Sequence, residues 1–170
     1  MTKKLATPYR IRAGNIDDIP EILKLVRELA GYEHLEDQVS ATPELYREHG
    51  FGSLRRFETR VVEKKDEGNS RLIAFALYFF TFSTFLGKPT LYLEDLFVLP
   101  DFRGRGIGKA LLTELAKIAE ENGCGRMEWM VLDWNEPAIE FYKALNAAPL
   151  SDWHVFRLKE KDIQQLAGQV

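Results

Sequence analysis

The sequence predicts a single α/β domain built on a mixed β-sheet. The chain has 170 residues, of which 45% are hydrophobic, which is enough for one domain with a buried core. Strand-like apolar runs and segments of helical periodicity follow one another in the order β-α-α-β-β-β-α-β-α-β. Tight hairpins between successive strands predict antiparallel pairs, and a helical crossover predicts a parallel pair. Because no repeat or linker interrupts the chain, we expect one domain over residues 1–170, with its core at about 8–159.

The first part of the chain predicts a strand and an amphipathic helix. Residues 9–12 alternate as a strand does, and Asn15 then offers a capping side chain. Apolar residues recur at helical spacing as far as Ala30, and Gly31 is expected to end the helix. Residues 32–53 lack a clean period and are expected to form a long substrate loop with a short helix that begins near Thr42 and Pro43.

Three strands are expected next. Residues 57–63 and 71–82 are rich in β-branched and aromatic residues and flank a polar turn, so they predict an antiparallel hairpin. A further strand is expected over residues 91–99, after the break at 87–89.

The last part of the chain alternates helices and strands. A helix is expected from Ile107, with apolar residues along one side, and Gly123 closes it. The remaining expected elements are a buried strand over residues 127–132, an amphipathic helix over 135–145, a final strand over 153–158 and a helical tail over 159–165.

The segment from Pro100 to Ala110 reads PDFRGRGIGKA and carries three alternate glycines between a strand and a helix. Glycine permits positive φ and close approach of the backbone to a ligand, and the first turn of a helix offers unpaired N–H groups to an anion. A dinucleotide fingerprint would need glycine at Lys109, and a phosphate-binding Walker loop would need Ser or Thr at Ala110. The segment therefore predicts a phosphate site of another kind, with a simple tight turn before a helix as the structural alternative.

Composition limits the partners and the compartment. The formal net charge of −3 gives no basic surface for nucleic acid and suits cationic partners better. The single cysteine, Cys124, cannot form an internal disulfide, and the first residues lack the apolar stretch of a signal peptide, so we expect the cytosol. No apolar run reaches the length of a membrane helix, and the spacing of the three histidines fits no zinc motif, so neither a membrane nor a metal is expected.

The glycine-rich segment, read together with the preceding Leu96-Phe97-Val98, resembles the signature of the GNAT superfamily of N-acetyltransferases. Three further stretches resemble its spermidine/spermine (diamine) and thialysine acetyltransferase subfamily, so the resemblance covers nearly the whole chain: Glu28-Leu29-Ala30-Gly31-Tyr32-Glu33, Leu91-Tyr92-Leu93-Glu94-Asp95-Leu96-Phe97-Val98, and Trp134-Asn135-Glu136-Pro137 with Phe141-Tyr142-Lys143. The resemblance implies a GNAT-type fold, in which a mostly antiparallel mixed sheet is flanked by helices and its central parallel strands splay apart. It also implies acetyl-coenzyme A (acetyl-CoA) as co-substrate and a homodimer.

The resemblance implies which residues bind the coenzyme. The backbone of Leu96, Phe97 and Val98 would pair with the pantetheine arm, as an added strand would. Asn135 would contact the pantetheine with its side chain, although capping the following helix is an alternative role. The pyrophosphate would be held by Arg103, Gly104, Arg105, Gly106, Ile107, Gly108 and Lys109.

The resemblance also implies two catalytic side chains. Tyr142 matches the tyrosine that protonates the departing thiolate of coenzyme A, and packing beside Phe141 is its structural alternative. Glu94 would face the acceptor amine and assist its deprotonation. Glu94 and Asp95 are adjacent on a strand, so their side chains are expected on opposite faces. Asp95 is either catalytic or a structural carboxylate that backbone N–H groups or a basic side chain satisfy.

The acceptor is expected to be a small cationic amine. Tyr32, Glu33 and Glu128 match positions that bind it, and a solvated Glu33 beyond a helix end is the structural alternative. Ser83 stands where the polyamine enzymes carry an aspartate, which favours short amines or lysine analogues over long polyamines. The sequence therefore predicts acetyl transfer to a primary amine by direct attack. The alternatives are a non-catalytic acyl-CoA-binding sensor and a protein N-acetyltransferase.

Overall fold

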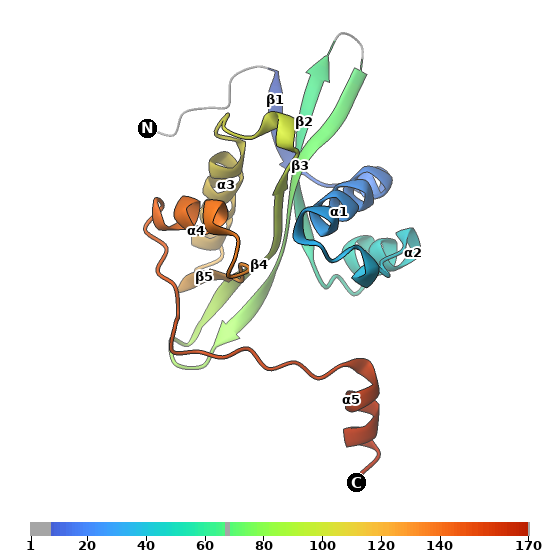
Figure 1. The fold of residues 1–170 in the computed structure, drawn as a ribbon, viewed down its shortest axis with the longest axis vertical. Coiled ribbons are helices and arrows are strands. Elements are labelled where there is room, and N and C mark those ends of the chain that lie inside the picture. The colour runs from blue at the N-terminus through green and yellow to red at the C-terminus, as the bar shows by residue number, and fades with distance from the viewer. Residues whose placement is uncertain (1–7, 67–68, 170) are drawn as a thin grey trace. The chain divides into compact units, whose positions relative to one another are not determined.

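The computed structural model describes residues 8–66 and 69–169, and its internal contacts divide the chain into two compact units. The first unit ends at Met130 and carries the β-sheet and the first three helices (Figure 1). The second unit begins at Val131 and carries α4 and α5.

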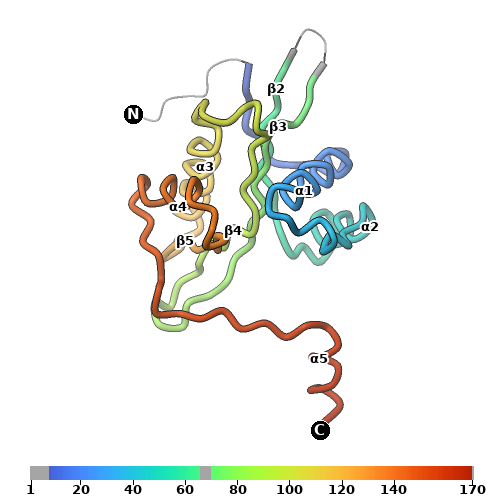
Figure 2. The backbone as a smooth tube through the Cα atoms, viewed as in Figure 1, coloured from blue at the N-terminus to red at the C-terminus, as the bar shows by residue number. Residues whose placement is uncertain are grey.

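A five-stranded mixed sheet forms the centre of the first unit, as the sequence predicts. Its strands lie in chain order, and every pair is antiparallel except the parallel pair of β4 and β5 (Figure 2). The strands are β1 (Tyr9–Ala13), β2 (Glu58–Asp66), β3 (Asn69–Ser83), β4 (Lys88–Val98) and β5 (Arg126–Trp129).

Helices cover both faces of this sheet. Helix α1 (Ile19–Glu33) lies over one face, and α3 (Ile107–Glu121) lies over the other (Figure 1). Under α1, one apolar cluster joins the helix to three strands and consists of Ile22, Leu25, Val61, Leu72, Phe75, Leu77 and Phe97. Burial of these side chains fixes α1 on the sheet, because apolar surface removed from water contributes about 25 cal/mol per Å².

Helix α1 is longer than predicted, because Gly31 lies inside it. The chain leaves the helix at His34, which adopts the left-handed conformation with φ of 58°, and the N–H of Leu35 donates to Ala30 O at 2.9 Å. This hydrogen bond satisfies a carbonyl of the last turn, so the helix needs no glycine to end. Tyr32 and Glu33 consequently belong to the last turn of α1 rather than to a loop.

The short helix expected near Thr42 is present as α2 (Pro43–Tyr46), and one turn of π-helix, η3 (Arg47–Phe51), continues it. The Thr42 hydroxyl accepts a hydrogen bond from Leu45 N at 3.3 Å and caps the helix. The segment between α1 and β2 is therefore more ordered than a simple loop.

Strand β5 is shorter than the predicted strand over residues 127–132. It ends at Trp129, and the next two side chains, Met130 and Val131, are exposed. Pairing with β4 covers four residues and ends at the pair Leu93 and Trp129. Beyond this point the two parallel strands separate, and β4 continues to Val98 with pairing to β3 alone among the described residues.

The second unit confirms the two expected helices but not the strand between them. Helix α4 (Glu136–Lys143) and helix α5 (Glu160–Ala167) form as predicted. Residues 153–158 form no strand, so the prediction of a final strand is wrong for the structure described. The apolar side chains of Trp153, Val155 and Phe156 are 73%, 70% and 93% exposed. A strand requires a neighbouring strand for its N–H and C=O groups, and the second unit contains none.

Candidate active site

The glycine-rich loop connects β4 to α3, and it has the backbone conformation that the sequence predicts. Gly104 and Gly106 adopt positive φ values of 73° and 78°, in which an L side chain would be strained. Gly106 occupies the N-cap position of α3, and no side chain caps the first turn of this helix. The N–H groups of that turn are available to an anion, and the helix dipole favours one there.

The two arginines of the loop have different surroundings. Arg105 donates from Nη1 to Tyr9 Oη and from Nη2 to Asp101 O, both at 3.0 Å, so its contacts hold the loop against β1. Arg103 donates from Nε to Val98 O at 3.0 Å, and its guanidinium carbon lies 4.6 Å from the ring centroid of Tyr32. Arg103 therefore connects the loop to the end of β4 and to the last turn of α1.

A β-bulge interrupts β4 at the two carboxylates that the sequence singles out. Leu77 of β3 lies opposite Asp95, whereas the next residue, Tyr78, lies opposite Leu93, so Glu94 is an extra residue without a counterpart. An extra residue breaks the alternation of side chains between the two faces of a sheet. The expectation that Glu94 and Asp95 face opposite sides assumed an unbroken alternation, which the bulge interrupts.

The electrostatics agree with a shared environment for these carboxylates. Burial, with smaller contributions from the charges of Asp95 and Glu94, raises the pKa of Tyr46 in α2 to about 12. Burial also raises the pKa of Asp95 to about 7, with smaller contributions from the charges of Glu94 and Glu33. Burial raises the pKa of Glu33 as well. The charges of Glu33 and Glu94 thus reach Asp95, and we call these three residues, at the end of α1 and the bulge of β4, the acidic cluster.

No basic side chain among the described residues forms an ion pair with Asp95, so the structural alternative of a carboxylate satisfied by Arg or Lys is not met. Three repelling carboxylates that share a half-buried region favour a bound cation, because a cation would offset both the repulsion and the loss of hydration. The cluster can therefore hold and deprotonate an ammonium group.

Glu128 lies on β5 beside this region, opposite Tyr92 of β4. Its Oε1 lies 3.0 Å from Arg126 Nε in a salt bridge, so it already has a cationic partner. Burial raises the pKa of Tyr92, and the charges of Glu94 and Glu128 add to this effect. Glu128 therefore contributes to the same negative field as Glu94, although its ion pair reduces that contribution.

The open edge of β4 lies beside the acidic cluster. Leu96, Phe97 and Val98 follow the point where β5 separates from β4, so on that side they pair with no strand of the described chain. Unpaired N–H and C=O groups on a strand edge can accept an extended ligand as an added strand. The arrangement is the one expected for a pantetheine arm.

Asn135 and Tyr142 belong to the second unit. The Asn135 side chain accepts a hydrogen bond from Ala138 N at 3.3 Å, so its structural alternative as the cap of α4 is confirmed. The rings of Phe141 and Tyr142 lie 5.3 Å apart in a tilted arrangement. Tyr142 thus has the aromatic contact that the structural alternative requires, and this contact leaves its hydroxyl chemistry untested.

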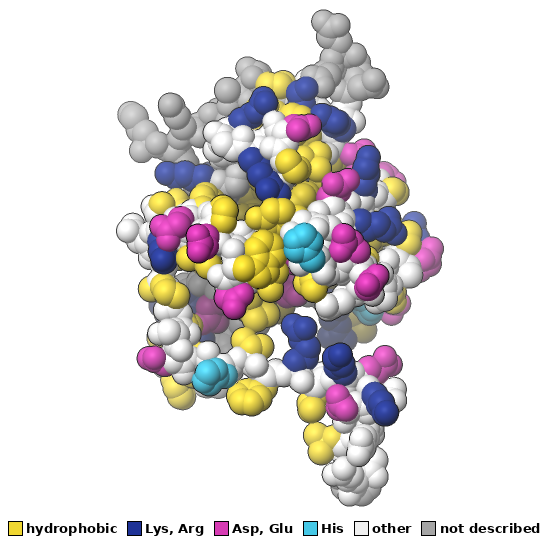
Figure 3. Space-filling view, viewed as in Figure 1, with side chains coloured by type: hydrophobic (Ala, Val, Ile, Leu, Met, Phe, Trp, Pro, Cys, Tyr) yellow, Lys and Arg dark blue, Asp and Glu magenta, His cyan; other side chains and the backbone are white. Residues whose placement is uncertain are grey.

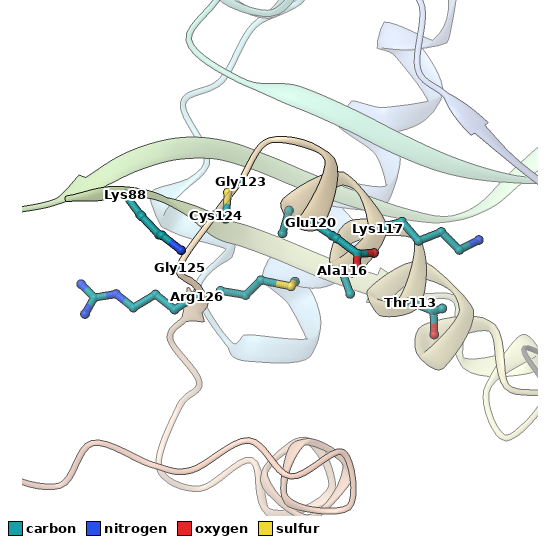
Figure 4. Close-up of a pocket in the computed structure, with 11 residues that line it drawn as sticks. Lys88, Thr113, Ala116, Lys117, Glu120, Gly123, Cys124, Gly125 and Arg126 are labelled. Carbon is teal, nitrogen blue, oxygen red and sulfur yellow. The ribbon is translucent and has the colours of Figure 1, made fainter. Parts of the chain in front are cut away.

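A hollow of the first unit lies away from these residues. It measures about 590 Å³ and is lined by the end of α3, the turn into β5 and the start of β4. Arg126 and Lys117 extend toward opposite ends of it, and Glu120 lies between them (Figure 4). Because its charged groups do not converge, we place the candidate site at the bulge and the glycine loop instead.

The described residues contain neither a candidate metal site nor a candidate membrane-spanning helix. No group of three or more His, Cys, Asp or Glu side chains there could hold a metal ion. Within the same part of the chain, no helix combines the length and the apolar character needed to cross a bilayer.

The model of the acetyltransferase (GNAT) family matches residues 21–147, which include the acidic cluster, the glycine loop and α4. The chain belongs to the GNAT family. It is 38% identical to a thialysine N-epsilon-acetyltransferase of Bos taurus, over 94% of this chain and 97% of that protein. It is 34% identical to spermidine/spermine N(1)-acetyltransferase-like protein 1 of Homo sapiens, over 95% of this chain but only 24% of that protein.

Solved structures confirm the GNAT fold. An integron cassette protein from the mobile metagenome of V. cholerae superposes with a TM-score of 0.78, at 24% sequence identity, over 95% of this chain and 99% of that one. The GNAT chain described here is accordingly an acetyltransferase, and enzymes of its family use acetyl-CoA.

Sequence reasoning missed two features of this GNAT site. Tyr46 was not singled out, although its ring packs against the α1 cluster and its hydroxyl lies in the field of the two β4 carboxylates. The bulge was not foreseen either. Two adjacent carboxylates in an apolar strand were the available signal, because a regular strand would place one of them in the core.

Proposed function

We propose that this GNAT enzyme transfers the acetyl group of acetyl-CoA to a primary amine of a small cationic acceptor. The observation that carries the proposal is the acidic cluster of Glu33, Glu94 and Asp95 beside the open edge of β4. The cluster supplies negative charge for an ammonium group, and the strand edge supplies hydrogen-bonding groups for the pantetheine arm.

The reaction proceeds by direct attack of the amine. The neutral amine nitrogen forms a bond to the thioester carbonyl carbon, and the bond between that carbon and the coenzyme sulfur breaks. Glu94, which is exposed at the bulge, assists removal of the amine proton, and Tyr142 donates a proton to the departing thiolate. The coenzyme pyrophosphate binds the glycine loop from Arg103 to Lys109, including the N–H groups at the start of α3.

The acidic cluster supports an acceptor with more than one positive charge. A single ammonium group would leave part of the repulsion among three carboxylates uncompensated. Ser83 adds no further carboxylate; it is buried at the end of β3, and its Oγ accepts from Leu86 N at 3.3 Å. We therefore propose thialysine, lysine or a short diamine as the acceptor, which agrees with the names of the curated relatives.

A thiol-release assay with acetyl-CoA and putrescine, spermidine, thialysine or lysine tests this proposal. At least one of these amines should be acetylated, and Glu94→Gln should lower its kcat/KM by about tenfold or more. Glu120→Gln, an exposed carboxylate on the far part of α3, is the matched control and should leave kcat/KM unchanged. Calorimetric binding of acetyl-CoA without acetylation of any of the four amines would contradict the proposal. Faster acetylation of peptide amines would indicate a protein acceptor instead.

We also infer that the enzyme is a homodimer. Residues 153–158 carry exposed apolar side chains on both faces of an extended segment, namely Trp153 and Val155 on one and Phe156 and Leu158 on the other. β5 is the last strand of the sheet order, so it has an open edge. Pairing of this segment with β5 of a second copy would satisfy both surfaces, because exposed apolar segments and open strand edges favour association.

A further inference from the structure

Arg103 contacts both regions of the proposed site. Its Nε donates to Val98 O at 3.0 Å, and its guanidinium carbon lies 4.6 Å from the ring centroid of Tyr32 and 5.5 Å from that of Phe97. Phe97 is 3% exposed within the α1 cluster, and Tyr32 packs against that cluster. The guanidinium therefore stacks on aromatic rings that belong to the first unit's core.

The two sides of this stack have different neighbours. Tyr32 directly precedes Glu33, the final residue of α1, whose charge contributes to the raised pKa of Asp95. On the other side, Arg103 directly precedes Gly104 of the glycine loop. Among the described residues, its Nη atoms donate no hydrogen bond to protein, so they can donate to a phosphate oxygen.

We propose that Arg103 is a positioning residue for the acceptor amine, because its stack on Tyr32 transmits coenzyme binding at the loop to the acidic end of α1. This inference rests on the proposed function and identifies how its two binding regions are coupled. Phosphate oxygens on the Nη atoms hold the guanidinium plane in one orientation over the Tyr32 ring. The last turn of α1 is thereby held with Glu33 near Asp95, and an ammonium group binds more tightly.

The size of the effect follows from the stack. A cation–π contact of this kind corresponds to a factor of about 3 to 10 in an equilibrium constant when it is partly shielded from water. Coupling between two binding sites is reciprocal, so the amine should strengthen coenzyme binding by the same factor by which the coenzyme strengthens amine binding.

The first test measures the amine KM at saturating acetyl-CoA in the wild-type, Tyr32→Phe and Tyr32→Leu backgrounds. The amine used is whichever of putrescine, spermidine, thialysine or lysine gives the highest kcat/KM. Arg103→Lys keeps the charge but loses the planar stack, so it should raise the amine KM about three- to tenfold in the wild-type and Tyr32→Phe backgrounds. In the Tyr32→Leu background, which has no ring, Arg103→Lys should change the KM by less than about twofold. Equal factors in all three backgrounds would overturn the inference.

Arg105→Lys is the matched control, because the Arg105 guanidinium lies over Phe102 and donates to Tyr9 Oη and Asp101 O. Its effect on the amine KM should be the same in all three backgrounds. The effect of Arg105→Lys could instead depend on the Tyr32 background as strongly as that of Arg103→Lys. Tyr32 would then be sensitive to any change in the loop, and the specific role of Arg103 would be overturned.

The second test does not depend on the amine. Coenzyme A alone should slow hydrogen exchange of the peptide covering residues 28–34 in the wild-type enzyme and should not do so in Arg103→Lys. Absence of this protection in a wild-type enzyme that binds coenzyme A and acetylates an amine would overturn the inference and leave the proposed function intact. Protection without acetylation of any amine would support the coupling while contradicting the proposed function.

Discussion

At the scale of single residues, two carboxylates of the first unit have pKa values shifted in opposite directions. Burial alone would raise the pKa of Asp18, but hydrogen bonds from Arg12 and from Asn15 N outweigh it and hold this pKa below its usual value. Arg12 reaches Asp18 with both Nη atoms, at 2.6 and 2.8 Å. Asp95 has burial without a cation, so its pKa rises to about 7. The neighbours therefore decide which carboxylate stabilises the fold and which one costs stability.

Arg12→Met should destabilise the protein by about 2 kcal/mol at pH 7, because it leaves a nearly buried carboxylate without its cation. The folded-state pKa of Asp18 is lowered, so the contribution of the pair is present above the unfolded-state pKa of about 4 and is lost as the pH falls. Urea denaturation should therefore show a smaller difference from wild type at pH 3. Arg10→Met, an exposed change on the same strand, is the control. An equal loss at both pH values would refute the ion-pair explanation.

Asp95→Asn should stabilise the protein at alkaline pH. The folded-state pKa of Asp95 is raised to about 7 from an unfolded value of about 4, so wild-type stability falls as the pH rises between these values. The variant has no charge to bury, and its advantage should grow between pH 4 and pH 7 to about 2 to 4 kcal/mol. Urea denaturation across this range measures it, with the exposed Asp37→Asn as control. A pH-independent difference would show that the carboxylate is not perturbed by burial.

At the scale of elements, irregularities rather than regular structure create the site. The bulge in β4 brings Glu94 and Asp95 into one field, and the early end of β5 leaves the edge of β4 open. Gly104 and Gly106 then turn the chain into α3 with its first N–H groups uncapped. Each irregularity gives up sheet or helix hydrogen bonds, and each makes backbone or side-chain groups available to a ligand.

Gly106→Ala should weaken coenzyme binding as well as the fold. An L residue at φ of 78° costs about 1 to 2 kcal/mol, and no atom lies near the added methyl group, so steric clash within the chain adds nothing. We expect the Kd for coenzyme A, measured by calorimetry, to rise about tenfold as the loop changes shape. Gly123→Ala, at φ of 64° beyond the other end of α3, should cost similar stability and leave this Kd unchanged. Equal Kd values for both variants would exclude the loop from coenzyme binding.

At the scale of the whole molecule, charge and exposed apolar surface favour different partners. Positive and negative side chains are interspersed over the surface seen in Figure 3, and no single-sign field suited to nucleic acid is visible there. Exposed apolar side chains occur in residues 153–158 of the second unit and also in residues 80–86 of the first. The negative net charge suits a small cationic substrate. The apolar side chains of residues 153–158 suit pairing with a second copy of the chain.

A double substitution, Val155→Asp with Phe156→Asp, should convert the proposed dimer to a monomer, because it places a charge on each face of the pairing segment. Multi-angle light scattering after size exclusion measures the mass of the particle. Ile163→Asp on α5 is a control at another exposed apolar position and should leave the dimer intact. A monomeric wild-type protein would contradict the inferred dimer.

The sequence by itself determined the elements and the type of ligand loop. Apolar periodicity indicated α1, α3 and α4, and glycines at 104 and 106 indicated the positive φ values that the structure has. These features depend on neighbours within a few residues, so local sequence contains the necessary information. The conformation of the glycine loop was predictable for this reason.

Only the tertiary structure decided the surroundings of Glu33, Glu94 and Asp95 and where the strands end. The bulge depends on the register between β3 and β4, and the raised pKa of Asp95 depends on its burial beside residues distant in the chain. The predicted strand over residues 153–158 has the right local pattern but no partner within its unit. Register, burial and strand pairing are set by contacts between distant segments, so a local pattern can suggest them but cannot fix them.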